Sequence, residues 1–518
     1  MITRLPWFKT LLFGCLGAVA SVPAFSAVAD IRTPRPPPTP RINGPTIFGV
    51  RPGSPFLYTI PVTGERPINY AVDNLPAGLS VDSATGRVTG SITKPGEYQV
   101  VFRASNKLGK AEKKFRIVVG EKIALTPPLG WNSWNSWAGS VDQDKVMRSA
   151  RVLISSGLAN HGWTYVNIDD TWQGERGGPH FAILGNEKFP DMKKLCDDIH
   201  ALGLKIGIYS SPWVTTYAGY RGGSSDTPDG AWTRIESYTE YKANHRLGKY
   251  TFEQNDAKQW AEWGFDYLKY DWNPNDIAHT KAMAEALRAT GRDIVFSLSN
   301  TAPFDDVAEL AKYANAWRTT GDIVDAWTPP TPEPWQNSVS EIGFNQDKWV
   351  PYGGPGHWND PDMLVVGWVG WGPKLHPTNL TPAQQYSHIS LWAMLASPLL
   401  IGADLERLDE FTLNLLTNDE VLAINQDALG HTAHRVATIG SVDVYRKQLE
   451  DGGVAIGFFN RGETTQSFPV QFERLGLPGP RHVRDVWRQR DLATVTDGQL
   501  EISVPAHDVL LYKITSAQ

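Results

Sequence analysis

The chain has 518 residues, of which 41% are hydrophobic and 20% charged, so it has the composition of a globular protein and is too long for a single core. Its formal net charge is −6, and no run of Lys or Arg follows the chain, which argues against nucleic acid or an anionic membrane surface as a partner. Length alone predicts about three domains.

The N-terminal segment predicts an export signal. Arg4 and Lys9 precede the apolar run LLFGCLGAVASV, and AVA at 27–29 fits a cleavage site that leaves Asp30 first. The alternative is an uncleaved membrane anchor, but the run is short for a bilayer, and no later stretch is apolar enough to span one. We therefore expect residues 1–29 to be a signal peptide and the mature protein to be secreted or periplasmic, with no membrane insertion.

A Pro-rich segment and a strand-rich domain come next. TPRPPPTPR predicts that residues 30–44 form an extended linker that does not pack. From 45 to 120, the alternating runs YQVVFRAS and KKFRIVV predict strands, and DSATGRV predicts a turn. This domain resembles the immunoglobulin-like (Ig-like) modules of exported bacterial enzymes, which implies a β-sandwich. Either substrate binding or a passive spacing role fits it.

Residues 121–428 predict a (β/α)8 barrel, the TIM-barrel fold. Eight strand-like runs alternate with amphipathic stretches such as DKVMRSARVLISSG and FEQNDAKQWAEWG. The eight runs are PLGWNSW, TYVNIDD, KIGIYS, DYLKYD, IVFSLSN, AWRTTGD, HWNDPDML and SPLLIGADL. Nearly all of them begin apolar and end polar or acidic. Because the carboxyl ends of barrel strands share one face, distant polar residues should meet there. These residues are Asp169, Asp170, Asp271, Asn300, Asp322 and Asp360.

Residues 429–518 return to short alternating runs. SVDVYRKQ, GGVAIGFFN and SFPVQFE are the first of them, and each is bounded by turn-forming residues. They predict an antiparallel β-sandwich that packs against the barrel and adds little chemistry. The whole chain is therefore expected to be multidomain, with a catalytic barrel between two β-sandwiches.

A face crowded with carboxylates and tryptophans suits a carbohydrate. Carboxylates accept hydrogen bonds from sugar hydroxyls, and two further carboxyl groups can cleave a glycosidic bond. The histidines lack zinc-like spacing, and NDPD at 359–362 favours a supporting role over sugar or calcium binding. We expect no metal and no cofactor. Composition and spacing do not assign catalytic roles among the carboxylates.

Seven motifs in order resemble those of glycoside hydrolase family 27, the α-galactosidase and α-N-acetylgalactosaminidase family. They are TPPLGWNSWNSW, YVNIDDTW, YLKYDWN, WRTTGDI, GHWNDPDMLVVG, SPLLIGADL and AINQDALG. The resemblance covers about residues 122–518. It implies that Asp271 is the nucleophile and Asp322 the acid/base. It also implies a set of sugar-binding residues: Trp134, Asp169, Asp170, Tyr209, Lys269 and Arg318.

Ser299 and Ala302 raise a question of specificity. The resemblance implies that these positions border the sugar's 2-position, where small residues leave room for an acetamido group. Galactose is the leading substrate, with α-N-acetylgalactosamine and β-L-arabinopyranose as alternatives. Retention of both Asp169 and Asp170 favours a sugar that has O6. The predicted activity is that of a retaining exo-α-galactosidase, and a non-catalytic carbohydrate-binding protein is the alternative from another class. The sequence does not predict an oligomeric state.

Overall fold

The computed structural model describes residues 30–517 except 236, 238, 239, 241, 330–335 and 373. The predicted signal peptide at 1–29 therefore lies outside the described residues. Within the part of the chain that the structure describes, no helix combines the length and apolar character needed to cross a membrane.

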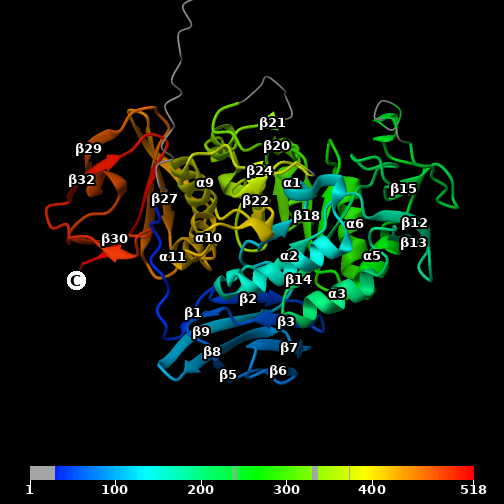
Figure 1. Ribbon diagram of the computed structural model, residues 1–518, viewed down its shortest axis with the longest axis horizontal. Helices are drawn as coiled ribbons and strands as arrows, with labels where there is room; N and C mark the ends of the chain where they lie inside the picture. The colour runs from blue at the N-terminus through cyan, green and yellow to red at the C-terminus, as the bar shows by residue number, and fades with distance from the viewer. Residues whose placement is uncertain are drawn as a thin grey trace, which may run out of the picture. The chain divides into compact units, whose positions relative to one another are not determined.

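The N-terminal domain has two main sheets around its own core, antiparallel except for the pair β2–β9, and a short antiparallel pair of β1 with β4 (Figure 1). One sheet has the order β2-β9-β8-β5 and the other β3-β7-β6. Burial alternates along β8 and β9, as expected for strands with one face in a core. The strands of the domain are β1 (Arg41–Ile42), β2 (Ile47–Val50), β3 (Pro55–Thr59), β4 (Val62–Thr63), β5 (Asn69–Asp73), β6 (Leu79–Val81), β7 (Arg87–Ser91), β8 (Gly96–Asn106) and β9 (Gly109–Val119).

Eight parallel strands form the central barrel, and all eight predicted runs are confirmed. They are β10 (Leu129–Asn132), β11 (Tyr165–Asn167), β14 (Lys205–Ser210), β17 (Tyr267–Asp271), β18 (Val295–Ser299), β19 (Ala316–Arg318), β22 (Trp358–Asp360) and β25 (Leu399–Ile401). Neighbours in space follow chain order, and β10 pairs with both β11 and β25. A parallel bridge between Leu364 and Ile401 closes the ring after β22.

Helices surround the barrel and begin at well-defined caps. The side chains of Asp142 and Asp276 accept backbone N–H bonds at the starts of α2 and α6, and Thr381 forms a capping box with Gln384 at α9. Gly264 ends α5 with φ +104°, which favours glycine. The helices are α1 (Trp134–Trp137), α2 (Gln143–Ser155), α3 (Met192–Ala201), α5 (Glu253–Trp263), α6 (Ile277–Ala289), α7 (Val307–Leu310), α8 (Val339–Gly343), α9 (Pro382–Met394), α10 (Glu410–Leu416) and α11 (Asp419–Asn425).

The loops of the barrel contain short pairs of strands. They are β12 (Gln173–Gly177) with β13 (Ala182–Gly185), β15 (Ser224–Ser225) with β16 (Tyr250–Thr251), β20 (Asp322–Ile323) with β21 (Gln336–Asn337), and β23 (Trp368–Val369) with β24 (His376–Pro377). Short 3₁₀ turns lie at Ala138–Ser140, Leu158–His161, Lys242–Asn244, Phe304–Asp306, Asp347–Tyr352, Leu405–Arg407 and Phe472–Leu475. The pair β20–β21 matters for function because it carries Asp322.

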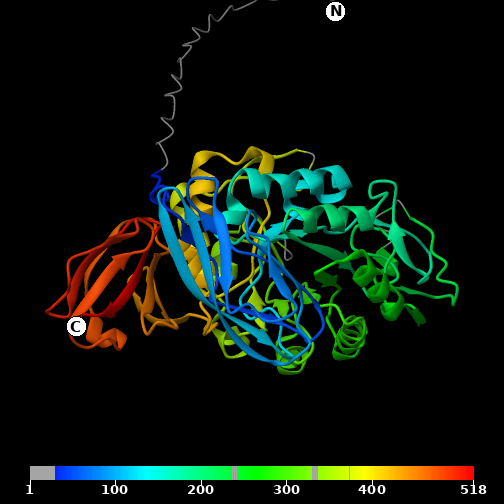
Figure 2. The same ribbon diagram turned by 90° about the horizontal axis from the view of Figure 1, so that it is seen from below.

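The C-terminal domain is an antiparallel sandwich (Figure 2, orange to red). Its larger sheet has the order β26-β27-β28-β33-β30-β31, and β29 pairs with β32 in the smaller one. Helix α9 is almost entirely buried because it contacts both the barrel and β28 and β33. The strands are β26 (His434–Ile439), β27 (Val442–Gln448), β28 (Val454–Asn460), β29 (Gln466–Gln471), β30 (Arg481–Asp485), β31 (Arg490–Asp491), β32 (Gln499–Val504) and β33 (Val509–Ser516).

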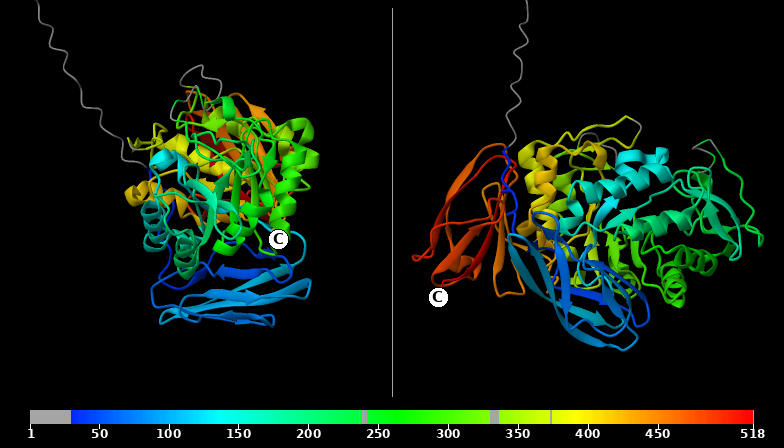
Figure 3. Two further views of the ribbon diagram at one scale, coloured as in Figure 1. Left: turned by 90° about the vertical axis from the view of Figure 1, so that its right-hand side faces the viewer. Right: turned by 60° about the horizontal axis from the view of Figure 1, so that its bottom comes forward.

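The expectation that the Pro-rich segment does not pack is wrong. The guanidinium of Arg32 pairs with the carboxylate of Asp508 at 2.9 Å and lies over the ring of Tyr386. The backbone N–H of Thr33 donates to Asn414 at 3.1 Å. Arg41 forms an ion pair with Asp419. The segment therefore runs as an anchored strap along the barrel and the C-terminal domain (Figure 3, dark blue).

Candidate active site

The predicted polar residues lie at the carboxyl ends of the barrel strands. Asp169 and Asp170 follow β11, and Asp271 is the last residue of β17. Asn300 follows β18, and Arg318 ends β19. Since the carboxyl ends of parallel barrel strands form one face, these groups share the face that carries active sites in this fold.

Asp271 is an enclosed carboxylate with two hydrogen-bond donors. The hydroxyl of Tyr209 donates to its Oδ2 at 2.9 Å, and the side-chain amide of Asn300 donates to its Oδ1. Burial raises the pKa of Asp271 to about 6, and the negative charge of Asp322 adds to the rise, while Lys269 and Tyr209 oppose it. The group is thus an ionisable carboxyl held rigidly, with its charge destabilised by burial.

Asp322 is the contrasting carboxyl of the site. Its side chain is 51% exposed, whereas Asp271 is only 6% exposed. It lies on β20 and accepts a hydrogen bond from the guanidinium of Arg318 at 3.3 Å. The solvent-accessible carboxyl of Asp322 therefore lies near enough to the enclosed one to raise the pKa of Asp271.

The tandem aspartates occupy a buried corner of the same face. Nζ of Lys269 binds Oδ2 of Asp169 at 2.8 Å. Burial disfavours the Lys269 charge, but Asp169 and Asp271 outweigh it and raise its pKa. Asp170 accepts a 3.0 Å bond from the backbone N–H of Ala218, and burial raises the pKa of Asp170 to about 6. The corner offers a cation and two carboxylates to a polyhydroxylated ligand.

Arg318 is buried between two acidic groups. Besides Asp322, its guanidinium contacts Oδ2 of Asp362 at 2.8 Å. The same oxygen accepts the backbone N–H of Ile323 at 2.9 Å, next to Asp322. Asp362 therefore fixes both Arg318 and the start of β20. This agrees with the supporting role that the sequence favours for NDPD.

The three tryptophans of WNSWNSW lie in different surroundings. Trp131 is fully buried, and its indole N–H donates to the carbonyl of Ala403 at 2.8 Å, so it belongs to the core. Trp137 is half-buried against that core. Trp134 starts α1 and is half-buried. Its role as the wall beneath a sugar stays a prediction.

The two proposed specificity positions have different surroundings. Ser299 is opposite Asp271 in the register of β17 and β18. The backbone N–H of Ala302 donates to the carbonyl of Arg318 at 2.9 Å, and its methyl group lies in the apolar core cluster. Both side chains are buried, so their contact with a sugar stays a prediction.

Two contacts of the site were not assigned by sequence reasoning. Asn300 was placed on the face, but nothing in the sequence indicated its bond to Asp271. The bond from Ala218 to Asp170 comes from backbone in a long irregular loop, which leaves no residue-type signal. Among the described residues, no cluster of three or more His, Cys, Asp or Glu side chains is arranged to hold a metal ion.

Family models match nearly the whole described chain. A model described as "Alpha galactosidase A" matches residues 126–237 and 234–427, which cover the barrel. The model "Alpha galactosidase C-terminal beta sandwich domain" matches 439–514. A model described as "Putative Ig domain" matches 39–120.

Individual relatives agree with these matches. An alpha-galactosidase of Oryza sativa is 34% identical over 76% of this chain and 85% of its own length. A Bacteroides fragilis structure described as a "putative alpha-galactosidase" superposes with a TM-score of 0.83 at 32% identity, covering 95% of this chain and 100% of the other. A β-L-arabinopyranosidase structure from Geobacillus stearothermophilus gives a TM-score of 0.63 at 29% identity, covering 76% and 97%.

Proposed function

Because the chain belongs to the α-galactosidase family of glycoside hydrolases, family 27, it is a glycoside hydrolase, and we propose that it removes terminal α-linked galactose with retention of configuration. The observation that carries the mechanism is the contrast between its two carboxyls. Asp271 is enclosed and held by Tyr209 and Asn300, whereas Asp322 is open to solvent.

In the first step, an oxygen of Asp271 attacks the anomeric carbon as the bond to the leaving oxygen breaks. Asp322 gives its proton to that oxygen, which leaves as an alcohol. The product is a glycosyl ester on Asp271. The donors Tyr209 and Asn300 fix the orientation of the attacking carboxylate.

In the second step, Asp322, now ionised, takes a proton from water. The water oxygen attacks the anomeric carbon and displaces Asp271 as a carboxylate. Because Asp322 is exposed, the leaving group can depart from it and water can take its place. Two inversions give net retention.

The enclosed corner supports the proposal of exo action. Asp169 and Asp170 are 2% and 1% exposed, and Lys269 lies beside Asp169. We expect these groups to receive the hydroxyls at the non-reducing end, so that only a terminal residue can reach Asp271. The predicted export signal completes the proposal of a secreted or periplasmic enzyme.

Two related substrates remain candidates, each on a specific observation. Ser299 and Ala302 are the small residues that would admit an acetamido group at the 2-position. The likeness to the Geobacillus β-L-arabinopyranosidase supports a pentose that lacks the hydroxymethyl group. The presence of both tandem aspartates favours galactose over that pentose.

The test is hydrolysis of nitrophenyl glycosides by the mature protein. The panel contains α-galactoside, α-N-acetylgalactosaminide, β-L-arabinopyranoside and α-glucoside, with Asp271→Asn as the control. We expect the α-galactoside to react fastest, the variant to be inactive, and NMR to show α-galactose as the first product. Faster cleavage of the acetamido sugar or the arabinoside would mean that galactose is not the preferred substrate. β-Galactose as the first product would contradict retention. No cleavage of any glycoside would favour a carbohydrate-binding protein.

A further inference from the structure

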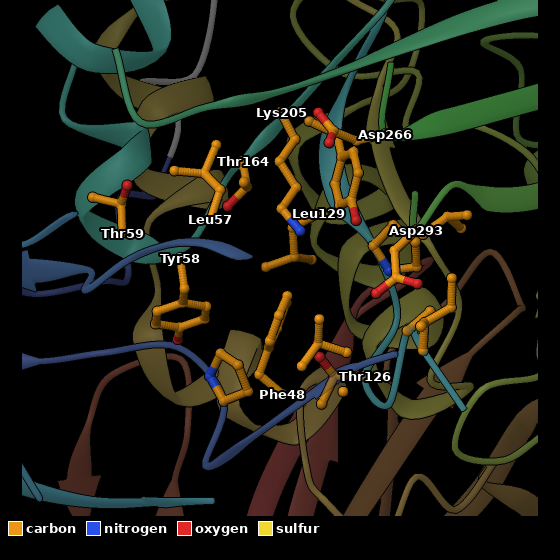
Figure 4. Close-up of a pocket in the computed structure, with 18 of the residues that line it drawn as sticks. Phe48, Leu57, Tyr58, Thr59, Thr126, Leu129, Thr164, Lys205, Asp266 and Asp293 are labelled. Carbon is orange, nitrogen blue, oxygen red and sulfur yellow. The ribbon is translucent and has the colours of Figure 1, made fainter. Parts of the chain in front are cut away.

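A cavity of about 470 Å³ is drawn in Figure 4. The first residues of several barrel strands line it, so it lies at the end of the barrel away from the catalytic carboxylates. The Ig-like domain contributes Phe48, Leu57 and Tyr58 to its wall. The barrel contributes Leu129 at the start of β10 and Lys205 at the start of β14. Its volume falls within the range of sites for small organic ligands.

Direct contacts between the two domains hold the walls of this cavity in place. Nε of Arg51 binds Oδ1 of Asp293 at 2.6 Å, and the hydroxyl of Thr59 donates to the carbonyl of Gly203 at 2.8 Å. The guanidinium of Arg87 donates to the carbonyl of Ala201 at 2.6 Å. The cavity is therefore preformed and does not depend on a ligand to assemble it.

The amine of Lys205 points into the cavity between Leu129 and Phe48 (Figure 4). It lies 4.6 Å from the ring centre of Phe48 and 5.7 Å from that of Tyr165. Within the described residues, no carboxylate forms an ion pair or a hydrogen bond with it. The rings offer a cation–π attraction but no acceptor for its three N–H donors.

The nearby carboxylates are already engaged. Asp266 accepts from Arg292 at 2.6 Å and from the backbone N–H of Ile206 at 3.0 Å, and it also binds His200 at 2.8 Å. Asp293 is paired with Arg51. Among the described cations that line the cavity, Arg292 and His200 bind Asp266, and Arg87 binds backbone carbonyls. In the part of the chain that the structure describes, Lys205 has neither an acid nor a carbonyl bonded to its amine.

Lys205 is half-buried, and its ammonium has no acid of the described residues bonded to it. An anionic partner would supply the charge-assisted hydrogen bonds that the neighbouring rings cannot. One cation close to the charges of Asp266 and Asp293 suits a monoanion better than a phosphate dianion. The remaining wall is rich in apolar side chains, including Ile47, Ile123 and Leu125. We infer that this cavity binds a small monocarboxylate, with its carboxylate on Lys205 and its apolar body against Phe48, Leu57 and Leu129.

The first experiment is calorimetric titration of the mature chain with 3-phenylpropionate and with its neutral amide. Because the amide lacks the charge, we expect it to bind roughly tenfold more weakly or worse, as charge-assisted bonds contribute more than neutral ones. Saturating galactose should not displace the acid, since its proposed site is at the opposite face. Equal affinity for acid and amide, no binding of either at millimolar concentration, or displacement by galactose would overturn the inference.

The second experiment removes the charge. Lys205→Met should weaken binding of the acid about tenfold and abolish the preference for acid over amide. Lys258→Met on α5 removes an exposed lysine away from the cavity and should leave both affinities unchanged. Unchanged binding in Lys205→Met would reject the site. If Lys205→Met does not fold, the difference in affinity between the acid and the amide on the unmodified chain tests the site by itself. Both experiments measure binding, so neither depends on whether the protein hydrolyses galactosides.

Discussion

The hydroxyl of Tyr209 donates a 2.9 Å hydrogen bond to Oδ2 of Asp271 from the adjacent parallel strand. Burial is the main reason that the pKa of Asp271 rises to about 6, and this bond opposes the rise. Tyr209 thus favours the ionised carboxylate that the proposed first step requires.

Tyr209→Phe should shift the pH dependence of catalysis. In the unmodified enzyme, kcat/KM should fall as the pH drops through about 6, because Asp271 becomes protonated. Loss of the donor raises the pKa of Asp271 further, so the acid limb should move up by about one pH unit. A pH profile of kcat/KM measures this. Tyr313→Phe, which removes another tyrosine–carboxylate contact outside the site, should leave the limb in place, and an unmoved limb in Tyr209→Phe would contradict the role of Tyr209.

Asp271→Asn should stabilise the protein at pH 7. The pKa of Asp271 is about 6 in the folded chain and near 3.8 when unfolded, so the folded state binds the proton more tightly. The stability that comes from protonation is present at low pH and is lost as the pH rises from about 4 to 6. At pH 7 the ionised carboxylate costs up to about 3 kcal/mol, which asparagine removes.

Calorimetry of that variant should therefore show a higher Tm than the unmodified protein at pH 7 and a shrinking difference toward pH 4. Asp305→Asn, at an exposed carboxyl outside the site, serves as the control and should change Tm little. A lower Tm of Asp271→Asn at pH 7 would show that burial of this charge is not the dominant effect.

Asp322→Ala should separate substrates by leaving group. Without a proton donor, cleavage of an alkyl galactoside should fall by about two to four orders of magnitude, whereas a dinitrophenyl galactoside needs little protonation and should lose much less. Added azide should restore turnover and give α-galactosyl azide, because Asp271 still forms the ester. Formation of the β-galactosyl azide instead would mean that Asp322 is the nucleophile and Asp271 the acid/base.

The strap at the N-terminus should contribute measurable stability. Arg32 and Asp508 are 9% and 6% exposed, so removal of one partner leaves a buried charge unpaired. Arg32→Met should cost about 3–5 kcal/mol and lower Tm. Arg35→Met is the matched control, since Arg35 and Glu410 are 95% and 74% exposed and such pairs contribute about 0–1 kcal/mol. A double-mutant cycle with Asp508→Asn measures the coupling energy between Arg32 and Asp508. Equal losses of stability in Arg32→Met and Arg35→Met would contradict a stabilising role of the strap.

The barrel was predictable because its signal is local. Each strand run is apolar at its start and polar at its end, so Asp169 and Asp271 could be placed on one face from spacing and topology alone. The separate roles of Asp271 and Asp322 required the family resemblance. Tertiary packing makes one of them enclosed and the other exposed, and this difference cannot be predicted from two residues that are both aspartate.

The rest depends on contacts between distant parts of the chain. The Pro-rich segment appeared unable to pack, because its partner Asp508 is 476 residues away and leaves no mark on the local pattern. The bond from Ala218 to Asp170 is made by a backbone group that any residue carries. The cation of Lys205 lines a cavity only because the Ig-like domain lies against the barrel.

The strap also sets an order of events during synthesis. Arg32 is among the first described residues to be made, yet Tyr386 and Asp508 follow it by 354 and 476 residues. At about 5–20 residues per second, Arg32 waits roughly half a minute or longer before its carboxylate partner exists. Docking of the strap is therefore a late event that joins the first residues of the described chain to domains completed after them.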